Sequence, residues 1–167
     1  MDKVVGKVIK VGNDIDTDII IPTQYMTLRT IAEMSKYAFE PLRPEIPTLV
    51  KKGDILLCGS NFGCGSSREQ APSILKELGF SCIIAKSFAR IFYRNALNNG
   101  ILALECSEIY DYVEEGNNIC IDLNQWKIYF NNKEVNVQPI PESFKEVIEL
   151  GSIVEYWSRR NKMKEKS

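Results

Sequence analysis

Apolar and polar residues alternate near the start of the chain in a pattern that predicts a β-strand. The alternation covers residues 4–11 and is stopped by a Gly-Asn-Asp turn at 12–14. Thr30 and Glu33 have the spacing of a capping box, so a helix is expected to begin there and to end near residue 41. The stretch 41–47 holds three prolines and is expected to be an irregular loop.

The middle of the chain alternates short apolar runs with helical patterns. A glycine-rich segment follows the first run, and Gly79 marks the end of the helix after it. This order predicts parallel strands joined by right-handed crossovers. The expected strands are 54–58, 81–85 and 101–104, and the expected helices run from Ser66–Ser67 to about 78 and from Ser87 to about 96.

The last third changes character, with short strands separated by asparagine-rich turns. A helical segment is expected from about 141 to 161, interrupted at 151–152, and the tail 161–167 is expected to fray. The whole chain, 1–167, is therefore predicted to be one α/β domain with mixed parallel and antiparallel strands. The last expected strands are 119–123, 126–130 and 135–137.

Length and charge limit the classes of function. A chain of 167 residues suits one compact domain. Its formal charge of -1 gives no electrostatic reason to bind nucleic acid or an anionic membrane. No apolar run is long enough for a membrane span, and the first residues lack the apolar core of a signal peptide. A cytoplasmic protein is expected.

Histidine is absent, which excludes histidine general bases, Ser-His-Asp catalysis and common zinc sites. Chemistry must therefore come from Ser, Asp, Glu, Lys, Arg, Tyr or backbone groups. The five cysteines are odd in number and form no C-x-x-C pair, so neither a disulfide framework nor a cysteine-bound cluster is indicated. Most are expected to be buried, inert thiols.

The segment 59–70 carries the most specific chemical signal. Its glycines at 59, 63 and 65 permit positive φ and close backbone approach. Ser66 and Ser67 are expected at a helix start, where N–H groups attract anions, and Ser67 with Gln70 could form a capping box. Arg68 adds a planar fork suited to a carboxylate. The alternative is a glycine-rich turn with a serine cap; a nucleotide P-loop is disfavoured because no Lys-Ser/Thr follows the glycines.

Three blocks of sequence resemble the swivelling domain of the aconitase superfamily, its C-terminal (fourth) domain. The block 59–71 resembles the active-site loop of that domain, in the form GSNFGCGSSREQA. The block 14–22, DIDTDIIIP, resembles the N-terminal D-x-D-T-D-x-I-x-P segment, and the block 85–95, AKSFARIFYRN, resembles a third family motif. The resemblance implies a β/β/α-type swivelling fold for the whole chain.

The resemblance also implies a partner. Aconitases are much longer single chains, and a free-standing domain of this length resembles the small subunits of the two-chain dehydratases of the superfamily. In those enzymes the large subunit carries a [4Fe–4S] cluster, so no cofactor is expected on this chain. The implied reaction removes water from a hydroxy di- or tricarboxylic acid and adds it back.

By resemblance, Ser66 stands at the position of the catalytic base of the family. An alkoxide there would need backbone N–H groups and nearby positive charge to stabilise it. Ser67 and Arg68 match positions that bind a substrate carboxylate. Asp18 matches an aspartate of the family site, with an orienting or proton-handling role; the alternative is a turn or cap carboxylate.

The segment 23–30 is where the resemblance implies substrate selection. If Arg29 points inward, an extra carboxylate of the homoaconitate type is favoured; if Met26 and Leu28 line the pocket, a branched group of the isopropylmalate or dimethylmalate type fits better. The alternative for Arg29 is a solvated residue before a helix. We expect isopropylmalate, and we expect this loop to be mobile alone because its composition offers little apolar anchorage. The alternative outside the enzyme class is a domain that binds an organic acid without catalysing a reaction.

Overall fold

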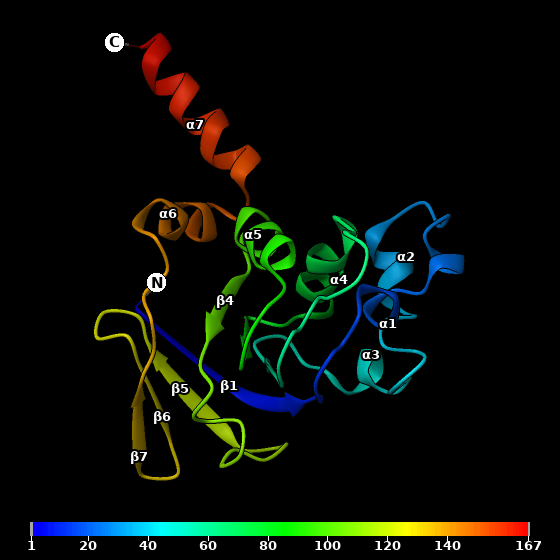
Figure 1. Ribbon diagram of the computed structural model, residues 1–167. Coiled ribbons are helices and arrows are strands. Elements are labelled where there is room, and N and C mark those ends of the chain that lie inside the picture. The colour runs from blue at the N-terminus through cyan, green and yellow to red at the C-terminus, as the bar shows by residue number, and fades with distance from the viewer. Residues whose placement is uncertain (1, 167) are drawn as a thin grey trace.

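The sheet has the strand order β4-β3-β2-β1-β5-β6-β7 in the computed structural model, which describes residues 2–166 (Figure 1). Pairing changes direction at β1 (Lys3–Lys10), whose first half is antiparallel to β5 and whose last residues are parallel to β2. The predicted mixture of parallel and antiparallel strands is therefore confirmed. The other strands are β2 (Ile55–Cys58), β3 (Cys82–Ala85), β4 (Leu102–Glu105), β5 (Asn118–Asp122), β6 (Lys127–Phe130) and β7 (Lys133–Asn136).

The parallel half of the sheet is built from two strand–helix–strand units. The helix α4 (Gln70–Leu78) connects β2 to β3, and α5 (Arg90–Asn98) connects β3 to β4. Every residue of β2 and β3 is buried, as expected for parallel strands covered on both faces. Gly79 ends α4 with φ 113°, a left-handed conformation that favours glycine.

The antiparallel half is a meander of β5, β6 and β7. Alternate residues of β6 are buried, which is typical of a strand with one face on the core. The turn between β6 and β7 has two asparagines with positive φ, 45° at Asn131 and 60° at Asn132. Asparagine tolerates this conformation better than most residues, so the predicted turn signal is confirmed.

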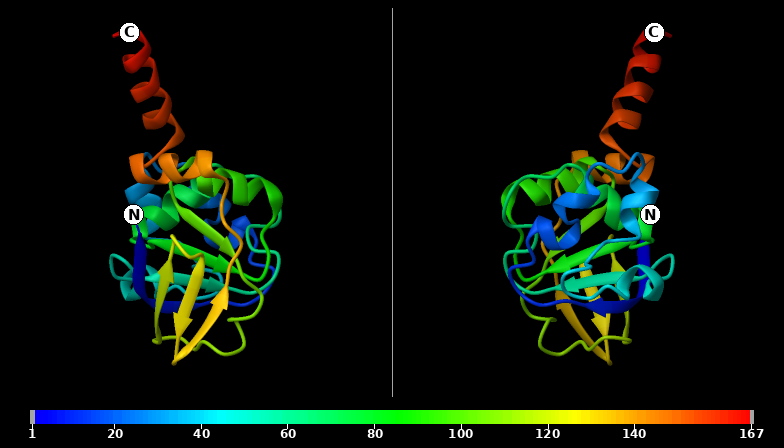
Figure 2. Two further views of the ribbon diagram at one scale, coloured as in Figure 1. Left: turned by 90° about the vertical axis from the view of Figure 1, so that its left-hand side faces the viewer. Right: turned by 90° about the vertical axis from the view of Figure 1, so that its right-hand side faces the viewer.

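The remaining helices are short except at the C-terminal end (Figure 2). One of them begins inside the proline-rich stretch 41–47 that the sequence predicts to be irregular and ends beyond it, because a proline near a helix N-terminus loses no hydrogen bond. No helix within residues 2–166 is long and apolar enough to cross a membrane. These helices are α1 (Thr17–Ile20), the 3-10 helix η1 (Thr23–Tyr25), α2 (Ile31–Ser35), α3 (Ile46–Leu49), α6 (Glu142–Leu150) and α7 (Ile153–Glu165).

The break between α6 and α7 lies where the sequence predicts it. Gly151 has φ 96° and ends α6, and the Ser152 hydroxyl accepts a hydrogen bond from the Glu155 N–H to cap α7. The helix α7 then continues to Glu165, beyond the end near Asn161 that the sequence predicts.

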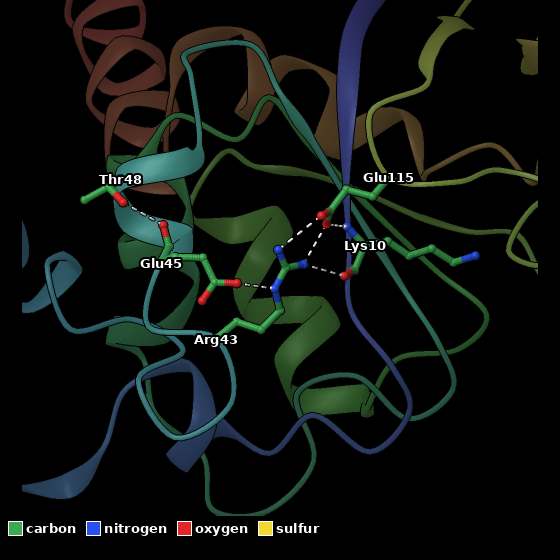
Figure 3. A network of polar contacts seen from close by, with 5 residues as sticks. All are labelled: Lys10, Arg43, Glu45, Thr48 and Glu115. Atoms are coloured by element: carbon green, nitrogen blue, oxygen red, sulfur yellow. Dashed lines mark hydrogen bonds and ion pairs between the residues drawn. The ribbon is translucent and has the colours of Figure 1, made fainter.

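An arginine at the end of β1 joins this strand to two other segments of the chain (Figure 3). The Arg43 guanidinium donates to both carboxylate oxygens of Glu115, at 2.6 and 3.1 Å, to the Lys10 carbonyl at 3.1 Å and to Glu45 at 2.8 Å. The Glu115 carboxylate also accepts the Lys10 N–H at 2.9 Å. The network therefore joins three separate segments through charge-assisted hydrogen bonds.

Candidate active site

Residues 59–69, here called the active loop, connect β2 to α4 and lie against both other motif blocks. The Gly63 N–H donates to the Ile15 carbonyl at 2.9 Å, and the Phe62 N–H donates to the Ser87 carbonyl at 3.0 Å. Three segments that are far apart in the sequence therefore meet at the end of β2. Such backbone bonds fix the loop without consuming polar side chains.

Two of the three loop glycines are required by the local backbone. Gly63 and Gly65 have φ 82° and 83°, whereas Gly59 does not adopt a positive φ. A Cβ on Gly63 would lie 2.2 Å from Phe92, and one on Gly65 would lie 2.2 Å from the Asp16 carboxylate. The close approach predicted for these glycines is therefore to other parts of the chain, which pack the loop tightly.

Ser66 presents its hydroxyl to the surface. The residue is exposed, and within residues 2–166 no hydrogen bond engages its Oγ. Its carbonyl, in contrast, accepts a hydrogen bond from the Thr17 hydroxyl at 2.6 Å. Thr17 is 2% exposed and its N–H also donates to the Cys64 carbonyl at 3.0 Å. The main chain of Ser66 is held while the side chain stays available.

The helix begins later than the sequence predicts. The first residue of α4 is Gln70, and Glu69 at the N-cap makes no side-chain capping bond. The predicted capping box of Ser67 with Gln70 is therefore wrong, and Ser66 and Ser67 lie in the active loop before the first turn. Pro72 is the third residue of α4, so its missing N–H removes no helical hydrogen bond.

Arg68 and Asp18 form an ion pair beside the two serines. The Arg68 side chain is 13% exposed and Asp18 is 59% exposed. The Arg68 Nη2 atom bonds Asp18 and also donates to the Thr23 hydroxyl at 2.9 Å, while Nη1 donates to the Ile21 carbonyl at 3.1 Å. Both Nη2 hydrogens are thus engaged, so a bidentate carboxylate ligand must displace Asp18 or Thr23.

Arg29 is not brought together with these residues. It is exposed, and within the described chain no ion pair or hydrogen bond engages its guanidinium. The main-chain N–H of Arg29 donates to the Glu33 carboxylate at 3.1 Å, and the main-chain N–H of Glu33 donates to the Thr30 hydroxyl at 3.1 Å. The capping bond predicted at Thr30 is therefore confirmed, although the returning carboxylate bond goes to Arg29.

The loop 23–30 is anchored through Tyr25. The rings of Tyr25 and Tyr37 stack with centroids 4.0 Å apart, and the Tyr25 hydroxyl donates to Glu40 at 2.7 Å. That hydrogen bond raises the pKa of Tyr25. Met26 and Leu28 also pack against the core. The sequence-based premise of little apolar anchorage is therefore wrong, because these side chains do find apolar neighbours.

A pocket of about 240 Å³ lies between the active loop and the start of α5. Ser67 and Arg68 line one side, and Arg90 and Ile91 line the other. Arg90 precedes Arg94 by one helical turn, and neither arginine forms an ion pair within residues 2–166.

Three of the cysteines have thiols that are unsuited to reactive roles. Burial raises the pKa of the Cys58 and Cys82 thiols in the sheet. Burial, and then the nearby Asp16 charge, raise the pKa of Cys64 in the active loop. Among the residues described, no three His, Cys, Asp or Glu side chains are grouped so that they could hold a metal ion.

Sequence similarity places the chain among known proteins. Residues 15–109 match the aconitase C-terminal domain family. The 3-isopropylmalate dehydratase small subunit of Lachnospira eligens is 48% identical over 160 residues, covering 96% of this chain and 97% of that protein. Small subunit 1 of the same name from Archaeoglobus fulgidus is 47% identical, covering 90% and 94%.

A solved structure has the same fold. The crystal structure of 3-isopropylmalate dehydratase from Methanocaldococcus jannaschii superposes with a TM-score of 0.92 at 36% identity, covering 98% of each chain. The matched domain family spans more than half of the sequence, and the relatives match it over nearly their full length. The chain therefore belongs to the family of 3-isopropylmalate dehydratase small subunits, which is built on the aconitase C-terminal domain.

Proposed function

We propose that this chain is the small subunit of a two-chain hydro-lyase that interconverts 2-isopropylmalate and 3-isopropylmalate by loss and re-addition of water, in leucine biosynthesis and in the cytoplasm. The partner is a large subunit with a [4Fe–4S] cluster. The observation that carries the proposal is the presentation of Ser66, whose exposed hydroxyl stands on a backbone held by Thr17 at 2.6 Å.

The reaction needs a base for a weakly acidic C–H beside a carboxylate. We assign that role to the Ser66 Oγ, which as an alkoxide takes the proton from carbon and returns it when water adds back. An unperturbed hydroxyl is too weak a base, so the neighbouring Arg68 charge and loop N–H groups must stabilise the alkoxide. The departure of hydroxide is left to groups of the large subunit.

Substrate binding is assigned to the residues around the serine. Ser67 and Arg68 line the same pocket and can bind a substrate carboxylate. Asp18 is proposed to orient the Arg68 guanidinium in the free chain, because the two side chains are already paired. When substrate binds, this contact breaks and the guanidinium binds the substrate carboxylate instead. Arg29 is proposed as a residue that contacts substrate only in the assembled enzyme, since here it is exposed.

The pocket beside Arg68 supports a branched apolar substituent. Besides the polar side chains, Ala89, Ile91 and Phe92 line it, and these side chains suit an isopropyl group better than a third carboxylate. Dimethylmalate has a similar apolar group and is the alternative substrate of the same reaction. The extra carboxylate of a homoaconitate-type acid could pair with Arg90 at the pocket, or with Arg29 if that side chain turns toward it.

The test is reconstitution with the candidate large subunit, whose cluster is rebuilt anaerobically. Isopropylmalate, dimethylmalate and homocitrate are offered in parallel, with and without this chain. We expect turnover that requires both chains and favours isopropylmalate. A stable complex with an intact cluster that converts none of the acids would support the other reading, a domain that binds an organic acid without catalysis.

A further inference from the structure

Arg90 is the first residue of α5 and lies at the pocket beside the active loop. The helix α5 follows β3 as α4 follows β2, and the two strands are parallel neighbours. Both helices therefore begin at the carboxyl ends of these strands, where open α/β sheets bind their ligands. Figure 1 shows the two helices side by side. Arg90 thus lines the same pocket as Ser67 and Arg68, although it comes from a separate strand–helix unit.

The start of α5 is fixed to the active loop by main-chain hydrogen bonds. The Phe62 N–H donates to the Ser87 carbonyl at 3.0 Å, and the Ala89 N–H donates to the Phe62 carbonyl at 2.9 Å. The rings of Phe62 and Phe92 also meet edge to face, with centroids 5.2 Å apart. The main chain next to Arg90 is therefore held in a fixed place relative to the loop, which preorganises this residue for binding.

The positive charge of Arg90 has no counter-charge in the described part of the chain. Its side chain is exposed, and within residues 2–166 no ion pair or hydrogen bond engages its guanidinium. The first turn of α5 contains no acidic residue, and Ala89 at the N-cap makes no side-chain capping bond. A cation is unfavourable at a helix N-terminus, because the helix dipole is positive there. Helix stability does not explain an arginine at this position, whereas an anionic ligand in the pocket does.

The pocket is cationic as a whole. The described residues that line it include two arginines and no carboxylate. Asp18, which is not among the lining residues, pairs with Arg68, so the charge that remains uncompensated is that of Arg90. A volume of about 240 Å³ is below the range of about 300–1,000 Å³ that is typical of sites for larger ligands. Two guanidinium groups at a pocket of this size suit a small acid with two carboxylates.

We propose that Arg90 binds the second carboxylate of the substrate while Arg68 binds the first. The inference rests on the proposed function, in which the substrate is an acid of the isopropylmalate type with carboxylates on adjacent carbons. Arg68 must leave Asp18 to bind its carboxylate, whereas Arg90 is available already. The apolar branch of the acid then lies against Ile91 and Phe92. Attachment at two points fixes the orientation of the carbon skeleton, which a single ion pair cannot do.

The test is the affinity of the reconstituted two-chain complex for 2-isopropylsuccinate, measured by calorimetry. This acid has both carboxylates and the isopropyl group but no hydroxyl to lose, so it binds without reacting. Arg90→Gln is expected to raise its dissociation constant about 30-fold, the effect of losing charge-assisted hydrogen bonds to one carboxylate. Arg90→Lys keeps the charge and is expected to recover part of the affinity.

The two monoamides of isopropylsuccinate show which contact is lost, because each lacks the charge of one carboxylate. One monoamide is expected to bind the wild-type complex about 30-fold more weakly than the diacid, and to bind the Arg90→Gln complex equally weakly. The other monoamide should still lose affinity when Arg90 is replaced. This pattern assigns Arg90 to one carboxylate of the ligand, which a general disturbance of the pocket would not produce.

Arg94→Gln is the matched control, because Arg94 is an exposed arginine one turn further along α5 that does not line the pocket. It is expected to change the dissociation constant by less than about twofold. A complex that does not bind isopropylsuccinate, an unchanged affinity in Arg90→Gln, or an equal loss in Arg94→Gln would overturn the proposal.

Binding is measured without turnover, so the two proposals fail separately. A complex that binds the diacid through Arg90 but converts no hydroxy acid contradicts the proposed function and supports the role of Arg90. A complex that converts isopropylmalate but binds the diacid equally well with Arg90→Gln overturns the role of Arg90 and leaves the proposed function standing.

Discussion

Arg43 and Arg68 are both paired with carboxylates, but their surroundings differ. Arg43 bonds Glu115 and Glu45 and a main-chain carbonyl, and its network joins the end of β1 to two other segments (Figure 3). Arg68 is less exposed, at 13% against 24%, and the carboxylate partners of both arginines are exposed. The difference is that the neighbours of Arg68 are serines with free hydroxyls. An arginine–carboxylate ion pair therefore joins separate segments of the fold at Arg43 and lies beside a candidate binding site at Arg68.

The difference teaches how to separate structural from functional ion pairs. A structural arginine has partners that no ligand needs to displace, whereas Arg68 must give up a contact before a carboxylate can bind it in bidentate fashion. The exposure of the arginine itself does not distinguish a structural ion pair from a functional one. The chemical groups beside the ion pair distinguish them.

Apart from the loss of Ser66 itself, the largest expected effect is the loss of the planar Arg68 guanidinium. Arg68→Lys is expected to lower kcat/KM of the reconstituted enzyme by about 100-fold, because an ammonium cannot bind a carboxylate in bidentate fashion. The matched control is Arg43→Lys, which is expected to keep kcat/KM within about twofold. Steady-state kinetics measure kcat/KM for both variants. Equal losses of kcat/KM would contradict the distinction between a functional Arg68 and a structural Arg43.

The next effect concerns the support of the active loop. Thr17→Val keeps the shape of the side chain but removes the hydroxyl that bonds the Ser66 carbonyl at 2.6 Å. We expect kcat to fall about tenfold with KM nearly unchanged, since a displaced base affects the chemical step more than binding. Thr17→Ser should restore most of kcat. A change in KM alone would contradict a positioning role.

A smaller effect is expected for stability at the other arginine. A double-mutant cycle with Arg43→Gln and Glu115→Gln should give a coupling free energy of about 1 kcal/mol, the upper range for ion pairs that remain partly exposed. Urea unfolding of the four chains measures it. The same cycle on Arg68 and Asp18 should give less, because Asp18 is 59% exposed. A larger value there would make that pair structural.

The smallest effect is the pH dependence of this coupling. The Arg43 hydrogen bond holds the pKa of Glu115 below its ordinary value. The stability from this pair is therefore present above the unfolded pKa of about 4.3 and is lost as pH falls through the lower folded pKa. Between these values the wild type should lose more unfolding free energy than Glu115→Gln. Parallel pH profiles of the two chains would contradict this.

Much of the fold could be predicted because local patterns and global structure agree. The fully apolar runs became buried parallel strands, and the asparagine turn and Gly79 lie where the sequence places them. The three motif blocks meet in space, a contact that was not predicted from the sequence. The start of α4 could not be predicted, because Ser67 looked like a cap but lies in the active loop instead.

The missed features depend on contacts between distant segments. Thr17 sits in the Asp-Thr-Asp block, yet nothing local reveals that its hydroxyl bonds Ser66, which lies 49 residues away. The stacking of Tyr25 on Tyr37 is likewise a tertiary contact that composition cannot predict. Such contacts override propensity, which explains why the loop 23–30 is anchored although its sequence reads as polar.

The most direct test of the account is the turnover number of the reconstituted enzyme with Ser66→Ala in place of the wild-type chain. The affinity of the variant for the large subunit is measured in the same preparation. We predict a loss in kcat of at least about 1000-fold with unchanged subunit affinity, because only the proposed base is removed. A variant that assembles normally and keeps a tenth or more of kcat would contradict the role of Ser66.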